Sequence, residues 1–255
     1  MNTSYESGAE YYDLIMEKVY QKNPKKIFDF IQFILSKKSL IKIDKILDFG
    51  CGTGIDSLFF SKNMYSVTGY DVSEKMLKLA QKKVSNDEYK LKFTNDLNAE
   101  KYDCIFSYGA FGHILSNENI KNTLNTIYNS LNPGGVFILH QENILGIIKY
   151  IKNRKHIFKD NGFKYKVKLD YKVDLLKSYL IETQKIKILK GSKVINFIQE
   201  NHIFRNWTYP EGMFFLENSG FKNIECYSSL NDRIELSGNE IGLIYCCIKE
   251  KLSNN

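Results

Sequence analysis

The sequence has few prolines, no C-x-x-C pair and no long apolar run. Three prolines occur in 255 residues, and neither a low-complexity tract nor an internal repeat is present, so a long linker between separate domains is disfavoured. The apolar runs fall far short of the ~20 residues that a membrane-spanning helix needs. Residues 1–8 are largely polar. We therefore expect a soluble, cytoplasmic protein.

Cysteine usage and charge exclude two further classes of protein. Most of the five cysteines lie in apolar, strand-like segments, so reduced structural thiols are expected rather than a disulfide framework. The formal charge is +7, but the lysines are scattered along the whole chain, and nucleic-acid binding needs clustered cations. What remains is a chain with 43% hydrophobic residues, long enough for one α/β domain with an inserted element.

The clearest chemical signal is the segment from Lys45 to Gly54. An apolar run ends at Asp48-Phe49, glycines follow at alternate positions (Gly50, Gly52 and Gly54), and a helix-like segment comes next. A buried strand that turns sharply into a helix leaves a crevice lined by backbone groups, and glycine lets a ligand approach that backbone closely. The segment predicts a loop that binds a nucleotide-type cofactor.

The spacing of the glycines indicates which cofactor. A dinucleotide fingerprint has glycines at positions one, three and six, but here the sixth position is Ile55 and the third glycine comes one residue early. Asp48 would repel a diphosphate and suit a cation. S-adenosylmethionine (SAM) carries an ammonium and a sulfonium and no phosphate. The segment Asp48 to Gly54 strongly resembles the first motif of class I SAM-dependent methyltransferases, which implies cofactor contacts from Asp48, Gly50, Cys51, Gly52 and Gly54.

The rest of the chain shows the alternation of strands and helices expected of that fold. We expect core strands at 45–49, 65–70, 89–93, 102–107, 136–140, 224–227 and 241–248, and helices at 9–22, 28–40, 56–63, 73–84, 118–131 and 209–219. Alternating apolar and polar residues predict three antiparallel strands at 163–169, 178–189 and 193–204. The prediction is a seven-stranded Rossmann-like sheet with helices on both faces and a small antiparallel β insertion over the active site.

Further cofactor contacts follow from positions at the carboxyl ends of the strands. Asp71 lies roughly 20 residues after the glycine loop begins, where a doubly wound fold places an acid that binds ribose hydroxyls; a plain acid beside the next helix is the alternative. In the resembled family, an acid at the position of Asp96 meets the adenine amino group, and a turn acid is the alternative. We assign four more residues to the cofactor site: Val72, Met76, Leu97 and Ser107.

The loop after the fourth strand carries the candidate catalytic residue, His113. A histidine there titrates near neutrality, although a lone histidine is more often structural. Phe111-Gly112-His113-Ile114, preceded by Ser107, is similar to the corresponding loop of SAM-dependent N-methyltransferases of nucleotide-linked amino sugars, where the histidine faces the sugar. Tyr5 and the segment Tyr11-Tyr12-Asp13 are also similar to that family, in which they close over cofactor and substrate. This implies a cofactor role for Tyr12 and a substrate role for Tyr5.

Other methyltransferase classes lack support in the same loop. Enzymes that methylate exocyclic amines of bases carry Asn or Asp followed by two prolines and an aromatic residue, whereas this chain has Ser107-Tyr108-Gly109-Ala110. Metal-dependent O-methyltransferases need a cluster of carboxylates, and none is visible, so no metal is predicted.

The second half is where we expect the acceptor to be selected. Candidate substrate contacts are Tyr108, His140, Arg205 and Trp207, of which the last two could equally form a strand-to-helix corner with core aromatics. The basic segment 146–160 is either a phosphate-binding lid or a solvated helix face. We expect a SAM-binding core with cap helices at 1–145, an inserted element at 146–208, and a final helix and strands at 209–255.

These features predict a class I SAM-dependent methyltransferase that acts on a small metabolite. The resemblance implies a nucleotide-linked or phosphorylated sugar-type acceptor, methylated on N or O, in surface-carbohydrate or secondary metabolism. Alternatives are O-methylation of a phosphoramidate-like capsule precursor, methylation of RNA or protein, and a binding protein that holds SAM or S-adenosylhomocysteine (SAH) without turnover. A mouth plugged by residues 146–210 would favour such a binder. The oligomeric state, monomer or homodimer, stays open.

Overall fold

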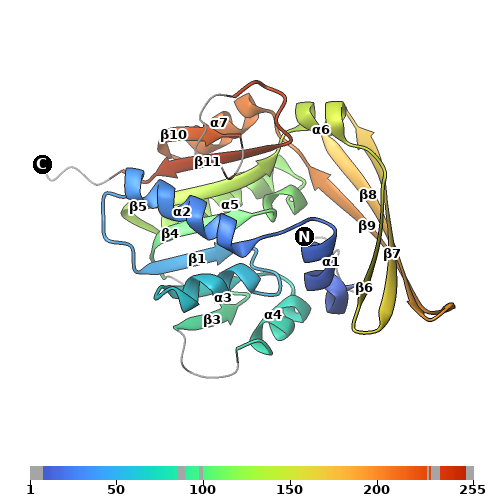
Figure 1. The fold of residues 1–255 in the computed structure, drawn as a ribbon. Coiled ribbons are helices and arrows are strands. Elements are labelled where there is room, and N and C mark those ends of the chain that lie inside the picture. Colours follow the sequence, from blue (N-terminus) through green and yellow to red (C-terminus); the bar gives the residue numbers. More distant parts are fainter. Residues whose placement is uncertain (1–7, 85–89, 98–99, 229, 231–235, 251–255) are drawn as a thin grey trace, which may run out of the picture.

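The computed structural model describes residues 8–84, 90–97, 100–228, 230 and 236–250. Tyr5 lies outside these residues. The described part of the chain forms a central sheet with helices on both faces, and a second sheet stands against one end of it (Figure 1). In the described residues, no helix is long and apolar enough to cross a membrane.

The central sheet has seven strands in the order β10-β11-β5-β4-β1-β2-β3. The first five strands along the chain run parallel, whereas β11 is antiparallel to both β5 and β10. This arrangement confirms the predicted Rossmann-like methyltransferase sheet. The strands are β1 (Lys45–Phe49), β2 (Ser66–Tyr70), β3 (Leu91–Thr94), β4 (Tyr102–Tyr108), β5 (Leu131–Glu142), β10 (Lys222–Tyr227) and β11 (Gly242–Ile248).

Two apolar clusters hold the helices against the two faces of this sheet. One cluster joins α5 (Asn117–Ser130) and α7 (Tyr209–Asn218) to residues such as Leu47 and Phe137, and the other joins α2 (Pro24–Lys38) and α3 (Ile55–Lys62) to Ile46 and Ile138. Because side chains alternate along a strand, Ile46 and Leu47 serve opposite faces. Burial on both faces explains why these strands read as continuous apolar runs.

Local capping signals define where several helices begin. The Asn23 side chain accepts hydrogen bonds from the amides of Lys25 and Lys26 at the start of α2, and Ser73 does the same for Met76 in α4 (Glu74–Gln81). Thr208 and Glu211 form a reciprocal capping box at the start of α7. Such caps satisfy amides that have no partner within the helix. Ser73, at which the helix predicted over 73–84 begins, is the N-cap of α4.

The insertion after β5 forms a four-stranded antiparallel sheet, which we call the lid sheet. It follows α6 (Ile144–Tyr150) and comprises β6 (Arg154–Asp160), β7 (Phe163–Asp174), β8 (Tyr179–Lys190) and β9 (Lys193–Arg205). The inner face of the lid sheet packs on Ile15 and Val19 of the N-terminal segment, which comprises a 3₁₀ turn (Ala9–Tyr11) and α1 (Tyr12–Lys18). We predicted three strands here. The fourth, β6, pairs with β7 over its whole length, so the basic segment 146–160 is a short helix followed by an edge strand.

Two further boundaries differ from the sequence predictions. The helix predicted over 9–22 ends at Lys18, and Gln21 adopts a positive φ of 55°. Residues 132–135, between the predicted helix at 118–131 and the predicted strand at 136–140, are part of β5, because Gly134 donates to the carbonyl of Lys249 at 2.7 Å and Lys249 donates to that of Gly135 at 3.0 Å. Tertiary pairing decides the second case, since Lys249 is far from Gly134 and Gly135 in sequence.

Candidate active site

The glycine loop turns the chain between β1 and α3 and leaves its backbone open. Gly50, Gly52 and Gly54 have φ values of 82°, 56° and 74°, which only glycine adopts without strain. The amides of Gly50 and Cys51 both donate to the carbonyl of Tyr70, at 2.7 and 2.9 Å, which ties the loop to the end of β2. A Cβ on Gly52 would approach only the Tyr12 ring, at 3.7 Å. The loop thus forms a cradle that a side chain would fill.

Asp71 faces this cradle from the end of β2. Its carboxylate accepts hydrogen bonds from the amides of Gly52 and Ser73, both at 2.9 Å. Burial raises the pKa of Asp71, and the backbone hydrogen bonds oppose that rise. A carboxylate can accept about four hydrogen bonds, so the two oxygens retain capacity for the two hydroxyls of a ribose.

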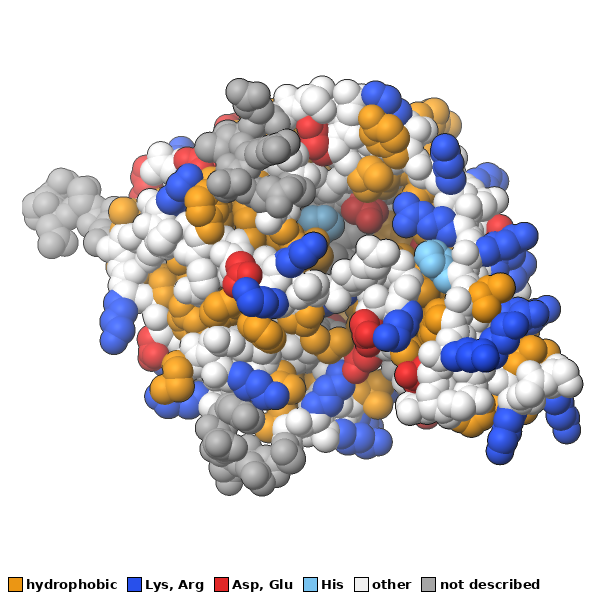
Figure 2. Space-filling model, viewed as in Figure 1, with side chains coloured by type: hydrophobic (Ala, Val, Ile, Leu, Met, Phe, Trp, Pro, Cys, Tyr) orange, Lys and Arg blue, Asp and Glu red, His pale blue; other side chains and the backbone are white. Residues whose placement is uncertain are grey.

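A cavity of about 390 Å³ lies between this end of the central sheet and the lid sheet. Figure 2 shows the hollow, with histidine and acidic atoms inside it and Lys and Arg side chains gathered over the lid sheet. The volume falls in the range of small-molecule sites. Six of the predicted cofactor residues line the cavity: Tyr12, Gly50, Gly52, Asp71, Val72 and Met76. Amides, a carboxylate, an aromatic ring and apolar side chains at one place fit the amino acid, ribose and adenine parts of SAM.

Other residues of the predicted cofactor set do not line the cavity. Asp48 is buried behind the loop, where it accepts a hydrogen bond from Ser57 at 2.6 Å. Burial, and then the neighbouring Asp56 carboxylate, raise the pKa of Asp48 to about 7. Cys51 is also buried, and a Cβ on Gly54 would lie 2.5 Å from Phe93. These residues shape the loop from behind.

The remaining three residues of that set lie away from the cavity as well. Asp96 is exposed in a turn where its own amide donates to the Thr94 hydroxyl at 3.0 Å. Leu97 packs against the apolar core. Ser107 is buried in β4 and borders a small void beside α2. The predicted adenine contact of Asp96 is therefore absent from the cavity wall.

His113 enters the cavity from a 3₁₀ turn (Phe111–His113) after β4. Its ring lies 4.8 Å from the ring of Phe204 in β9. Burial lowers the pKa of His113 to about 4, so the imidazole is neutral at pH 7. General-base catalysis is most effective when the pKa lies near the working pH. The structure thus brings the predicted catalytic residue to the site but makes it a weak base.

Tyr108 and His140 form the part of the wall contributed by β4 and β5. Their rings stack with centroids 4.3 Å apart. Burial, followed by the charge of Lys22, lowers the pKa of His140 to about 4. Both residues line the cavity, in keeping with their predicted role as substrate contacts.

Arg205 and Trp207 do not line the cavity, in contrast to our prediction. Trp207 is fully buried and packs against Phe111 and Phe215, with ring centroids 6.0 and 5.2 Å apart. Arg205 donates to the carbonyl of Leu115 at 3.1 Å. The segment around Arg205 and Trp207 is therefore the alternative that we named, a strand-to-helix corner with core aromatics.

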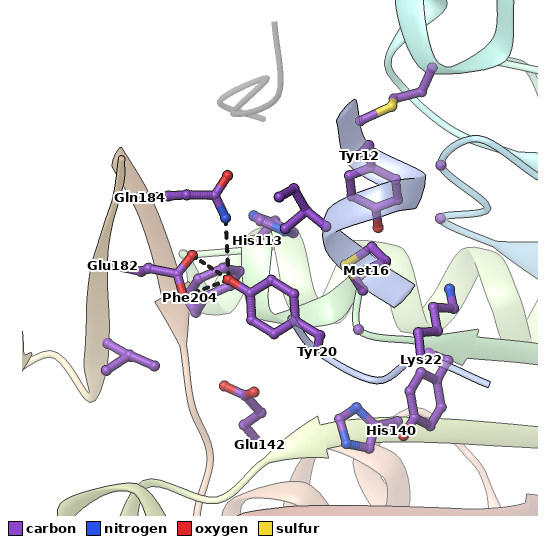
Figure 3. Close-up of a pocket in the computed structure, with 18 of the residues that line it drawn as sticks. Tyr12, Met16, Tyr20, Lys22, His113, His140, Glu142, Glu182, Gln184 and Phe204 are labelled. Atoms are coloured by element: carbon purple, nitrogen blue, oxygen red, sulfur yellow. Dashed lines mark hydrogen bonds between the residues drawn. The ribbon is translucent and has the colours of Figure 1, made fainter. Parts of the chain in front are cut away.

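The lid sheet, the segment after α1 and the end of β5 supply residues that the sequence analysis missed. Figure 3 shows side chains from these regions converging on the cavity. The residues missed are Tyr20, Lys22, Glu142, Arg154, Tyr171, Glu182, Gln184, Glu200 and Phe204. A signal was present in β8, where Glu182 and Gln184 interrupt the otherwise apolar inner face.

A buried ion pair holds the segment after α1 beneath the glycine loop. Lys22 Nζ lies 2.6 Å from Asp56 Oδ2, and only 12% and 5% of the two side chains is exposed. Burial lowers the pKa of Lys22, but the charges of Asp56 and Tyr12 and the hydrogen bond to Asp56 together raise it above its usual value. Asp13 of α1 adds contacts to Thr53 and Lys83. The N-terminal segment is thereby fixed as one wall of the cavity.

Replacing Lys22 by alanine is expected to lower the free energy of unfolding by about 3–5 kcal/mol, because Asp56 would stay buried without its partner. Lys25→Ala is the matched control, since its pair with Asp29 at 2.5 Å is 69% and 54% exposed and such pairs contribute about 0–1 kcal/mol. Urea denaturation measures both. Equal effects of the two substitutions would contradict this account of the buried pair.

Comparison with known proteins supports the same assignment. A methyltransferase domain family matches residues 46–135. A Geobacillus protein provisionally named a methyltransferase is 28% identical over 167 residues, which span 63% of each protein. An uncharacterized protein of Methanocaldococcus jannaschii is 30% identical over 186 residues, covering 70% of this chain and 67% of its own length. The match thus spans less than two thirds of the Geobacillus protein.

Solved structures share the fold over nearly the whole chain. A SAM-dependent methyltransferase from Clostridium acetobutylicum has a TM-score of 0.78 at 19% identity and covers 95% of this chain and 99% of its own. A sugar N-methyltransferase from Streptoalloteichus gives 0.77 at 13%, covering 94% and 93%. A SAM-bound amino pentose methyltransferase from Micromonospora echinaspora gives 0.72 at 15%, covering 93% and 96%. With the glycine loop and Asp71 in place, residues 46–135 form a methyltransferase domain, and the chain has the fold of the class I SAM-dependent methyltransferases, for which SAM is the cofactor.

Proposed function

We propose that this protein transfers a methyl group from SAM to a small sugar-type acceptor held beneath the lid sheet. One observation carries the proposal: the cavity is lined at one side by the glycine loop and Asp71 and at the other by His113 and the lid sheet. Donor and acceptor sites in one cavity permit direct transfer. The similarity in fold to two sugar methyltransferases supports the choice of acceptor class.

SAM supplies a methyl group on a sulfonium, which is a good leaving group. The glycine loop and Asp71 would hold the cofactor, while α1 and the lid sheet would exclude water and orient the acceptor. Placing two reactants in line can supply up to roughly 7–11 kcal/mol of the barrier reduction in favourable cases. Positioning by the walls of the cavity is therefore the main contribution that we assign to this chain.

A nucleotide or phosphate on the acceptor would lie toward the lid sheet. Arg154 lines the cavity, whereas Lys155 and Lys159 lie on the opposite face of the edge strand β6, because side chains alternate along a strand. Arginine and lysine bind phosphate oxygens. Arg205, a predicted substrate contact, donates to the carbonyl of Leu115 instead.

The geometry favours an enzyme over the alternatives. Residues of 146–210 line the cavity beside His113 and leave it open (Figure 2), whereas a binder without turnover would have this mouth plugged. A long RNA or a folded protein needs an extended surface rather than a cavity of about 390 Å³. Tight, salt-sensitive RNA binding would revive the RNA alternative.

Incubation of the protein with SAM and a panel of sugar phosphates and nucleotide sugars, with and without an amino group, tests the proposal. Mass spectrometry should detect one or more added methyl groups on at least one acceptor, with matching release of SAH. Turnover of none of the sugars by a protein that binds SAH would overturn the sugar assignment.

Substitution of His113 separates positioning from base catalysis. Because the pKa of His113 lies at about 4, we expect His113→Asn to lower kcat by less than the about 10²–10⁴-fold that a general base contributes. Steady-state kinetics on the acceptor identified above provides the measurement. Two results together would restore His113 as the general base. The loss in kcat would be larger than this, and the kcat of the wild type would titrate with a single group whose titration is absent from the variant.

A further inference from the structure

We infer that Glu142 and Glu182 form an acidic subsite that binds a positively charged amine of the acceptor. The inference rests on the proposed function and narrows its acceptor to the amine-bearing members of the class. It is drawn from the placement of these two carboxylates, which come from different sheets and meet in one cavity.

Glu182 is fixed on the inner face of the lid sheet. Its carboxylate accepts the Tyr20 hydroxyl at 2.8 and 2.9 Å, and Gln184 donates to the same hydroxyl at 3.5 Å. Tyr171, the direct neighbour of Glu182 on β7, also hydrogen bonds to it. Only 3% of Glu182 is exposed. A buried carboxylate held by two hydroxyls, which keep its orientation, is a preorganised acceptor.

Glu142 approaches from the opposite side, at the end of β5. Figure 3 shows its carboxylate pointing toward Tyr20 and Glu182 from the side opposite Gln184. Within the described part of the chain, no side chain or amide donates a hydrogen bond to this carboxylate. Burial, and then the charge of Glu182, raise the pKa of Glu142 to about 7. A carboxylate whose charge is disfavoured by burial and by a neighbouring carboxylate is stabilised by a cation beside both.

The charges around the cavity do not provide that cation from within. Lys22 is paired with Asp56 at 2.6 Å. The charge of Arg154 lowers the pKa of Glu182, but it does not contribute to the pKa shift of Glu142. His113 and His140 have pKa values of about 4 and are neutral at pH 7. Among the described residues that line the cavity, the acids outnumber the bases: Asp71, Glu142, Glu182 and Glu200 against Lys22 and Arg154.

An ammonium group fits this subsite better than a hydroxyl or a phosphate does. It supplies three donors and one positive charge, which match acceptor oxygens on Glu142 and Glu182. A hydroxyl has one donor and would leave a buried carboxylate without a partner, and a phosphate would be repelled. Charge-assisted hydrogen bonds contribute about 1.5–3 kcal/mol, so we expect the amine to bind about tenfold or more tightly than its hydroxyl analogue.

The decisive experiment measures binding rather than turnover. Wild-type protein saturated with SAH is titrated with the matched pairs glucosamine and glucose, and galactosamine and galactose, followed by protein-detected NMR at neutral pH. We expect at least one amino sugar to bind about tenfold more tightly than its partner. The variants Glu142→Gln and Glu182→Gln should remove the preference. The matched control Glu217→Gln, an exposed glutamate on α7, should retain it.

The dependence on pH offers a second readout. Below its pKa of about 7, Glu142 is protonated, so the affinity for an amine that stays charged should fall as the pH drops through 7. Glu142→Gln should lose this dependence. The charged and titratable groups that line the cavity with Glu142 are Tyr12, Tyr20, Lys22, Tyr70, Asp71, Tyr108, His113, His140, Arg154, Tyr171, Glu182 and Glu200. Burial also raises the pKa of Glu182, so Glu182→Gln is measured beside Glu142→Gln, whereas His113 and His140 have pKa values of about 4.

Three results would each overturn the inference. They are equal binding of the amine and hydroxyl sugars, no binding of either sugar, and a preference for the amine that survives in the Glu142→Gln/Glu182→Gln double variant. SAH titration of every variant shows that the cofactor side is intact. Failure of the wild type to bind SAH would instead overturn the proposed function, so the two failures are distinguishable.

Discussion

Replacing Asp71 by alanine should weaken SAH binding by about 10²–10⁴-fold, as measured by isothermal titration calorimetry. A ribose diol would lose two hydrogen bonds to a charged acceptor, each contributing about 1.5–3 kcal/mol, and 1.4 kcal/mol corresponds to a factor of ten. The carboxylate also anchors the amides of Gly52 and Ser73, both at 2.9 Å. The loop itself should loosen when the acid is removed.

Two further variants test which acid contributes to the affinity for SAH. Asp71→Asn keeps one acceptor oxygen and should retain part of the affinity. Asp96→Asn tests the adenine contact that the family resemblance implies; because Asp96 lies in an exposed turn outside the cavity wall, we expect its affinity for SAH to stay within about twofold of the wild type. A large loss in Asp96→Asn with none in Asp71→Ala would contradict the cofactor site described above.

Replacing Gly50 by alanine should lower the free energy of unfolding by about 2–5 kcal/mol and abolish tight SAH binding. The new Cβ would lie 2.1 Å from the Cβ of Ala110, so one of two backbone segments must move, which typically costs about 1–3 kcal/mol. The positive φ of 82° adds about 1–2 kcal/mol for any residue with a Cβ. Urea denaturation and SAH calorimetry provide the two measurements.

Gly109→Ala separates strain from steric overlap. Gly109 has a φ of 86°, and a Cβ there would meet nothing within 4 Å, so only the conformational cost of about 1–2 kcal/mol should appear. Adding Ala110→Gly to Gly50→Ala removes the overlapping atom and should restore stability to the level of Gly109→Ala. If Gly109→Ala destabilised as much as Gly50→Ala, the close approach of Gly50 and Ala110 would have no measurable role.

Much of the donor side followed from local sequence. A chain that turns sharply from a buried strand into a helix needs residues with positive φ, and the alternate glycines after β1 supply them. The spacing of Asp71 from the glycine loop placed it at the end of the next strand. Gly50, Gly52 and Asp71 line the cavity. Within the same motif, however, spacing could not separate Gly52, which faces the cavity, from Gly54, which packs against Phe93. That distinction depends on a strand that is distant in sequence.

The acceptor side depended on tertiary structure. Trp207 looked like a stacking platform, yet it fills the core between Phe111 and Phe215, because any large aromatic ring gains more from full burial when a core is within reach. Glu142 and Glu182 lie 40 residues apart by number, on different sheets, and only the fold brings them together. Glu182 interrupts the apolar inner face of β8, but nothing in either segment indicates that it lies in one cavity with Glu142.

Sequence by itself determined the class of fold, the cofactor and the approximate position of His113, since each follows from short-range patterns of glycine, acid and apolar residues. The tertiary structure decided that His113 is a half-buried, weakly basic residue and that acids outnumber bases in the described wall of the cavity. Protonation and charge balance depend on burial and on neighbours from other strands. Those quantities exist only once the lid sheet has closed over the carboxyl ends of the core strands.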